Sequence, residues 1–110
     1  MGKFVVTTRK NGDFQFNLVA GNGQVIMSSQ GYKAKATCMN GIESVRKNCA
    51  DDSKFERKTA ANGKFYFNLK ATNGQVIGSS QMYAGEAGME NGIKSVATNA
   101  PDANVEEVTE

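Results

Sequence analysis

Asn22–Tyr32 reads NGQVIMSSQGY, and Asn73–Tyr83 reads NGQVIGSSQMY. Almost the same sequence of eleven residues, the repeated phrase, therefore occurs twice in the chain. Shifting the sequence by 51 residues aligns 11–49 with 62–100, and by direct count about 23 of the 39 aligned positions are identical. Such a duplication predicts two copies of one supersecondary unit that close a core together. We therefore predict a first repeat at 1–53 and a second repeat plus a C-terminal strand at 54–110, joined in one compact pseudo-two-fold domain.

Each copy begins with alternating apolar and polar residues. Phe14, Phe16 and Leu18 alternate with Gln15 and Asn17, a period that predicts a strand with one apolar and one polar face. Asn-Gly pairs stand at both ends of this strand, and Asn-Gly tolerates the positive φ of tight hairpins. We therefore predict a three-stranded meander in each copy, with strands near 3–9, 13–20 and 24–29 and then near 54–60, 64–71 and 75–80.

The hydrophobic period lengthens after each meander. Cys38, Ile42, Val45 and Cys49 are spaced by four, three and four residues, which predicts the buried stripe of an α-helix. The second copy repeats this spacing at Met89, Ile93, Val96 and Ala100. An Asn-Gly pair inside each helix favours a turn instead, but a hairpin there would interrupt the stripe. We expect helices, in which a glycine such as Gly41 lets the helix lie close to the sheet despite costing about 1 kcal/mol relative to alanine.

The end of the chain completes the predicted order. Pro101 cannot continue the second helix, while Val105 and Val108 predict a short last strand in an acidic, frayed terminus. The order βββα-βββα-β predicts an α+β fold, in which an antiparallel sheet carries both helices packed on one face. The phenylalanines then line the inner face.

The combination of Asn-Gly, Phe-x-Phe-x-Leu, Ser-Ser-Gln-x-Tyr and Gly-Ile-x-Ser-Val elements closely resembles the YegP-like family, small bacterial proteins of unknown function. Both copies carry these elements, as in NGKFYFNLKATNGQVIGSSQMY followed by GIKSV. The resemblance implies a βββα-β unit used twice, with a single sheet and C-terminal strands exchanged between units. It also implies that one-unit relatives form homodimers, of which this chain is the fused form, and it implies no activity.

The helix starts depart from the family pattern, in which Ser or Thr two residues after the tyrosine can cap the helix. Ala34 and Gly85 occupy those positions here. We therefore expect the first helix to begin later, with Thr37 nearer its cap, and the second to use Gly85 as a weak cap. Asn48 and Asn99 suit helix C-termini, where a left-handed residue is common.

Composition and charge exclude several classes of protein. No apolar run approaches the roughly 18 residues of a membrane span, and the N-terminus has no segment of signal-peptide type. The net charge of +2 is too small for the domain-wide basic field of strong nucleic-acid binders, although residues 1–58 are basic and residues 59–110 acidic. Cys38 and Cys49, eleven residues apart on one predicted helix, are too distant for a disulfide, so we expect free thiols and a cytoplasmic address.

The chain lacks the residues that most enzymes need. It has no histidine, which removes the commonest general base and metal ligand, and two cysteines alone make no zinc site. Asp51 and Asp52 lie between the copies and suit a solvated turn better than an acid–base pair. No phosphate-binding loop or dinucleotide fingerprint is present. We therefore expect no cofactor, no metal and no enzymatic activity.

Two sets of polar residues remain as candidate sites. The first is a polar or anion site at the Ser-Ser-Gln-x-Tyr elements, where helix N-termini and nearby lysines favour anions. The alternative is structural, with the serines bonding backbone groups and the tyrosines packing over the helix starts. The first set comprises Ser28, Ser29, Gln30, Tyr32, Lys33, Lys35, Ser79, Ser80, Gln81 and Tyr83.

The second set lies on the predicted outer face of the sheet, where an exposed tyrosine among lysines and amides could stack a base. Ordinary solvated strand residues are the alternative, with the lysines protecting an edge. This set comprises Gln15, Asn17, Lys64, Tyr66, Asn68 and Lys70.

These observations favour a non-enzymatic, cytoplasmic binding or interaction module, monomeric through the pairing of its two repeats. We expect an unknown protein partner and no membrane association. The alternative function is weak binding of single-stranded nucleic acid through the outer sheet face or the basic N-terminal half. Salt distinguishes the two, because phosphate-driven binding weakens steeply as salt rises.

Overall fold

The computed structural model describes residues 2–109, in which both copies fold in the same order of elements. The first copy contains β1 (Lys3–Thr8), β2 (Phe14–Val19), β3 (Val25–Ser29) and α1 (Lys35–Asn48). After a 3-10 turn at Asp52–Lys54, the second contains β4 (Phe55–Thr59), β5 (Phe65–Lys70), β6 (Val76–Ser80) and α2 (Glu86–Asn99), and β7 (Asn104–Thr109) ends the chain. The α+β class is confirmed, and the strands of both meanders lie within one residue of their predicted limits.

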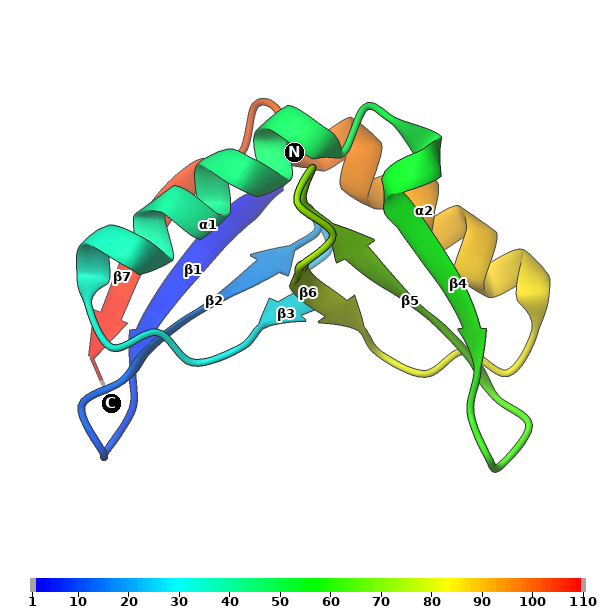
Figure 1. The fold of residues 1–110 in the computed structure, drawn as a ribbon, viewed down its shortest axis with the longest axis horizontal. Coiled ribbons are helices and arrows are strands. Elements are labelled where there is room, and N and C mark those ends of the chain that lie inside the picture. The colour runs from blue at the N-terminus through cyan, green and yellow to red at the C-terminus, as the bar shows by residue number, and fades with distance from the viewer. Residues whose placement is uncertain (1, 110) are drawn as a thin grey trace.

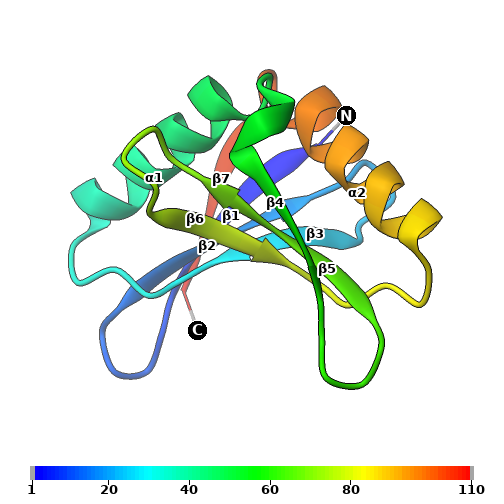
Figure 2. The same ribbon diagram turned by 45° about the vertical axis from the view of Figure 1, so that its right-hand side comes forward.

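The strands form one seven-stranded sheet in the order β4-β5-β6-β3-β2-β1-β7. Figures 1 and 2 show α1 and α2 on the same side of this sheet, with β3 and β6 side by side at its centre. The central pair is antiparallel, with Ser28 opposite Ser79 on the pseudo-two-fold axis. None of the helices described within residues 2–109 is long and apolar enough to cross a membrane.

The outermost strand of the first copy comes from the end of the second. β7 runs parallel to β1 from Lys3 opposite Asn104 to Thr8 opposite Thr109. The prediction of an antiparallel sheet is therefore wrong for this one pair. Two parallel strands cannot be joined by a tight hairpin and need a crossover connection, and β7 follows α2 in the chain and not a hairpin. β7 extends to Thr109, and Glu110 lies outside the described residues, so the fraying of this end stays a prediction. A C-terminal strand thus passes from the second copy to the first, but no strand among residues 2–109 passes the other way, so the implied exchange is found in one direction only.

The Asn-Gly pairs between strands build the four hairpin turns. Gly12, Gly23, Gly63 and Gly74 have φ between 84° and 90°, a conformation that only glycine adopts without strain. In each turn, the preceding asparagine accepts a hydrogen bond from the backbone N–H two residues further on, at 3.0 Å. The other Asn-Gly pairs lie inside α1 and α2, as the helical stripe predicted.

Both copies contribute to one apolar core beneath the helices. The Phe4 and Phe16 rings meet edge to face with centroids 5.8 Å apart, and Phe55 and Phe67 repeat this geometry at 5.6 Å. α1 contacts β5 and β6 as well as β2, while α2 contacts β3 as well as β5. Each helix therefore covers strands of the other copy, which is why neither unit closes its core alone.

One of the two differences in the repeated phrase lies at the centre of this core. The Met27 side chain is fully buried, and its counterpart is Gly78. A Cβ at Gly78 would come within 3.1 Å of both the Met27 side chain and the Ser28 carbonyl oxygen. Because the pseudo-two-fold axis brings these positions together, one methionine and one glycine fill a space that two methionines would overfill.

The helix ends differ from expectation at three positions. α1 begins at Lys35 with Ala34 as its N-cap, so the prediction of a later start near Thr37 is wrong, and the Thr37 hydroxyl instead donates to the Ala34 carbonyl at 2.8 Å. Gly85 is the N-cap of α2, as predicted. Neither Asn48 nor Asn99 is left-handed. Both side-chain amides instead donate to the carbonyl four residues earlier, that of Ser44 or Ser95, and so fold back along the last turn of the helix.

Candidate functional site

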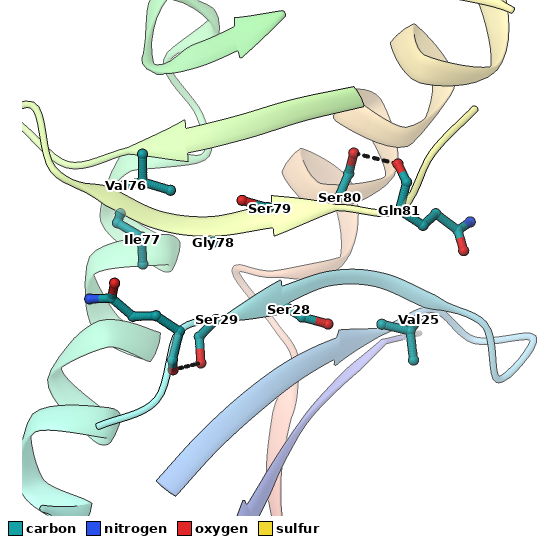
Figure 3. A pocket seen from close by; sticks show the side chains of 10 residues that line it. Val25, Ser28, Ser29, Val76, Ile77, Gly78, Ser79, Ser80 and Gln81 are labelled. Carbon is teal, nitrogen blue, oxygen red and sulfur yellow. Dashed lines mark hydrogen bonds between the residues drawn. The ribbon is translucent and has the colours of Figure 1, made fainter. Parts of the chain in front are cut away.

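The two Ser-Ser-Gln elements meet across the centre of the sheet and line a groove of about 440 Å³, the seam groove (Figure 3). Its lining comes from both central strands and the residues just after them. The first copy supplies Val25, Ser28, Ser29 and Gln30. The second supplies Val76, Ile77, Gly78, Ser79, Ser80 and Gln81. The groove therefore exists only because the repeats join, and six of the ten residues predicted for the first candidate site lie in it.

The second serine of each pair has a structural task. The Ser29 hydroxyl accepts a hydrogen bond from the Phe16 N–H at 2.9 Å and donates to the Gln30 carbonyl at 2.8 Å. Ser80 repeats both bonds with the Phe67 N–H and the Gln81 carbonyl. These hydroxyls replace ladder bonds where β3 and β6 leave the sheet, which confirms the structural interpretation for this pair.

The first serine of each pair faces the opposite side of the sheet from the helices. Strand register places Asn17 opposite Ser28, Ser28 opposite Ser79, and Ser79 opposite Asn68. Paired residues in a sheet point to the same face, so these four polar side chains form a row across the four central strands. The sequence had assigned the amides and the serines to separate candidate sites, and the structure brings them together.

Hydrogen bonding along this polar row is not symmetric. In the second copy the Ser79 hydroxyl donates to Asn68 Oδ1 at 2.6 Å, and the Asn68 amide donates to Glu56 at 3.3 Å. In the first copy, Asn17 Oδ1 is buried and accepts no hydrogen bond within the described residues. Position 5, which pairs with Asn17, holds valine where the second copy holds glutamate. Within residues 2–109, Asn17 and Ser28 thus keep hydrogen-bonding groups free, whereas the equivalent groups of Asn68 and Ser79 bond each other.

The tyrosines of the repeated element pack against the helices and do not line the seam groove. A Cβ at Gly41 would lie 2.5 Å from the Tyr32 hydroxyl oxygen, and one at Gly92 would lie 2.4 Å from that of Tyr83. The mid-helix glycines therefore leave room for these rings. The prediction that the glycines allow close packing is confirmed, with the tyrosine rings as the groups that approach the helices. Burial raises the pKa of the Tyr32 and Tyr83 hydroxyls above the ordinary value for tyrosine.

The lysines predicted to favour an anion lie elsewhere. Lys35 begins α1 and forms an ion pair with Glu107 of β7, while Lys33 is exposed and does not line the seam groove. The chemistry of the groove is therefore that of hydroxyls, amides, backbone groups and valine side chains. Among residues 2–109, no Asp, Glu, Lys or Arg lines it.

The remaining outer-face candidates are already engaged or peripheral. Gln15 accepts two hydrogen bonds from Arg9 and donates to the Ser29 carbonyl. Lys70 pairs with Glu56 at 3.0 Å. Tyr66 is half-buried opposite Lys58 in β4, and Lys64 is exposed in the turn before β5. The structure therefore does not gather these four side chains around one space.

The two cysteines belong to the core. Cys38 and Cys49 are free and almost fully buried, and burial raises the pKa of both thiols. Within residues 2–109, no three His, Cys, Asp or Glu side chains gather as metal ligands would. Nothing in this part of the chain indicates catalysis.

Sequence reasoning missed the hydrophobic part of the groove lining. Val25 and Val76 are each 38% exposed and lie near opposite ends of the groove in Figure 3. Both belong to the repeated phrase, so repetition alone could have suggested them. Their place beside the groove depends on the pairing of β3 with β6, and a period-two pattern within one strand does not show that pairing.

The fold and the seam groove define a class: an α+β tandem-repeat protein with an uncharged groove of mixed polar and apolar lining on its internal pseudo-two-fold axis. The sequence model of a family described as "Domain of unknown function (DUF1508)" matches residues 10–56 and again residues 60–107. The chain belongs to this family, and the two matches confirm the tandem repeat.

Named relatives match almost the whole chain. The "UPF0339 protein in ptx operon 5'region" of Stutzerimonas stutzeri is 54% identical, with coverage of 97% of this chain and 96% of that protein. The "UPF0339 protein YegP" of Escherichia coli K12 is 47% identical over 98% of both chains. The solution NMR structure of E. coli yegP, 47% identical, superposes with a TM-score of 0.93 over 98% of this chain and 93% of that one. A Shewanella oneidensis UPF0339 structure, 44% identical, also gives 0.93, over 98% and 92%. The resemblance predicted from sequence is thus confirmed, and none of these descriptions states an activity.

Proposed function

We propose that this protein is a non-enzymatic binding module that holds a protein partner in the seam groove. The observation that carries the proposal is the convergence of the duplicated Ser-Ser-Gln elements, from positions 51 residues apart, on one groove. Hydroxyl and amide groups beside exposed valines suit a ligand with both polar and apolar groups, such as a polypeptide.

Unequal hydrogen bonding supports the same proposal. Ser28, unlike Ser79, makes no side-chain hydrogen bond within the described residues, and its neighbour Asn17 keeps an unpaired buried oxygen. A partner can therefore hydrogen-bond to the Ser28 hydroxyl without displacing an existing side-chain bond of that hydroxyl.

The proposal includes a monomeric module in a reducing, cytoplasmic compartment. Two free buried thiols support that compartment, since cysteines in oxidising compartments are commonly paired. The pairing of β3 with β6 inside one chain supports the monomer, because it provides internally the contact that a dimer of single units would make.

Affinity capture with matched variants tests the groove. Ser79→Tyr places an aromatic ring in it, whereas Thr7→Tyr places the same ring on the same face of the sheet but on β1, outside the groove. Both variants are compared with the unchanged protein in a lysate of the organism that encodes it, with and without nuclease and at two salt concentrations.

A protein retained by the unchanged chain and by Thr7→Tyr, but lost from Ser79→Tyr, supports the proposal if it survives nuclease and high salt. Equal retention by all three chains contradicts a site in the groove. Nucleic acid that is recovered at low salt and lost at high salt would instead support the single-strand alternative, for which the half-buried Tyr66 and the basic first half are the available features.

A further inference from the structure

The two ends of the sheet are not equivalent, although the repeats are. At one end β7 covers β1 in parallel register. At the other end stands β4, which the 51-residue shift equates with β1, and its outer edge has no neighbouring strand among residues 2–109. Figure 1 shows β4 and β7 at opposite ends of the sheet. An uncovered edge presents unpaired backbone N–H and C=O groups that can accept a further strand.

Each copy has a groove beside its first strand, β1 or β4. Only the groove at β1 has β7 along one side. The first-copy groove, about 220 Å³, is lined by Val6, Thr8, Phe14 and Lys35 together with two residues of β7. The second-copy groove, about 270 Å³, is lined by the equivalents of those four, Arg57, Thr59, Phe65 and Glu86, together with Lys58 and Met89. The second groove is therefore the same structure without the wall that β7 supplies.

The charge at this position differs in sign between the copies. In the first copy Lys35, the first residue of α1, forms an ion pair with Glu107 of β7. In the second copy Glu86, the first residue of α2, takes that place and has no ion-pair partner within residues 2–109. The strand that suits this groove therefore carries a cation where β7 carries Glu107.

The other charges at the β4 edge already have partners. Arg57 stands where the first copy has the buried Val6, and it pairs with Glu90 of α2 at 2.6 Å and with Asp52 at 2.9 Å. Lys58 lies 3.8 Å from Glu56 on the other face. An inward-pointing charge on an edge strand opposes indiscriminate pairing with other edges. Arg57 thus disfavours pairing of this edge with a second copy of itself. Glu86 has no ion-pair partner in the described residues and can pair with a cation on an added strand.

We propose that the β4 edge binds an extended segment of a partner protein as an eighth strand, parallel to β4. The pairing of β7 with β1 defines its chemistry. An apolar residue lies opposite Phe55, as Val105 lies opposite Phe4, and a lysine or arginine follows two residues later, opposite Arg57 and beside Glu86. This surface is separate from the seam groove, so the two proposals succeed or fail independently.

A peptide copy of β7 provides the probe. Two synthetic peptides span residues 102–109, one unchanged and one with Glu107→Lys, and each is titrated into the isotope-labelled full chain while its backbone amide NMR signals are recorded. The matched protein variant is Glu86→Lys, which restores the charge found at this position in the first copy. Lys35 already begins α1 there, so a lysine is compatible with the helix start.

The proposal expects reciprocal preference. The unchanged protein binds the Glu107→Lys peptide at least about twofold more tightly than the unchanged peptide, and the Glu86→Lys protein reverses this order, as exposed ion pairs of this kind allow. The shifted amides are those of β4 and the start of α2. The proposal is overturned if β4 amides do not move with either peptide, if the shifts fall on β1, or if Glu86→Lys leaves the preference unchanged.

Discussion

Gly92 lies in the interior of α2, where replacing glycine by alanine ordinarily stabilises a helix by about 1 kcal/mol. The structure predicts the opposite sign here. A Cβ at this position would lie 2.4 Å from the Tyr83 hydroxyl oxygen, 2.9 Å from the same ring's Cζ and 3.1 Å from Phe67 Cε2. Ordinary contacts begin near 3.4 Å, so the ring would have to move by about 1 Å.

The Tyr83 ring has little freedom to make that movement. Its backbone N–H and carbonyl both bond to Phe65, at 2.7 and 2.8 Å, and the ring stacks on Phe67. Overpacking of this kind costs about 1–3 kcal/mol, and we take the upper end because two rings resist the shift. After the helical gain of about 1 kcal/mol is subtracted, Gly92→Ala should destabilise the protein by about 2 kcal/mol.

Gly88→Ala is the matched control in the same helix. Its Cβ would meet the Tyr83 ring at an ordinary 3.4 Å, so the variant should be neutral or more stable by up to about 1 kcal/mol. Urea unfolding followed by circular dichroism measures both, as a shift in midpoint at unchanged slope. Adding Tyr83→Phe removes the closest atom and should recover part of the loss. If Gly92→Ala is as stable as Gly88→Ala, the packing role of Gly92 is wrong.

Three further predictions concern the core, the hydroxyl bonds and the ion pairs. Phe67→Ala should cost about 3–5 kcal/mol by urea unfolding, because the ring is fully buried, whereas Tyr66→Ala on the other face should cost much less, and similar losses would contradict the assignment of faces. Ser29→Ala should cost about 1–3 kcal/mol and speed exchange of the Phe16 amide that it bonds; unchanged exchange would contradict this role. Arg57 holds the pKa of the Glu90 carboxyl below its ordinary 4.5. The ion pair should therefore stabilise the folded protein by at most about 1 kcal/mol above pH 4.5. This stabilisation should disappear as the pH falls through the lower pKa that Glu90 has in the folded protein. NMR titration should show that pKa rising in Arg57→Gln, and an unchanged value would refute the pairing.

Much of the secondary structure follows from local patterns. The alternation of Phe14, Phe16 and Leu18 identifies a strand and its buried face, since successive side chains in a strand point to opposite sides. The spacing of Cys38, Ile42 and Val45 identifies α1 despite an Asn-Gly pair inside it. Both inferences succeed because period and burial are properties of a single element, readable without knowing its neighbours.

The candidate site could be predicted only in pieces. The repeated phrase singled out Ser28 and Ser79, but their meeting on one axis depends on β3 pairing with β6, a contact between residues 51 positions apart. The tyrosines of the same motif and the lysines that follow it do not line the seam groove with the serines, for a related reason. Proximity along the chain does not show that Tyr32 turns toward Gly41 in α1 or that Lys35 pairs with β7.

The sequence by itself determined that two copies of a βββα unit share a core. Repetition and hydrophobic periodicity can be read within each segment of the chain, and both copies show them. Only the tertiary structure decided where the copies stop being equivalent. Met27 and Gly78 divide one space at the axis, β7 covers β1 but not β4, and Glu86 faces a groove where Lys35 has a partner. These differences arise from contacts between distant segments, whose free energies depend on shape and charge across an interface and leave no periodic pattern along the chain.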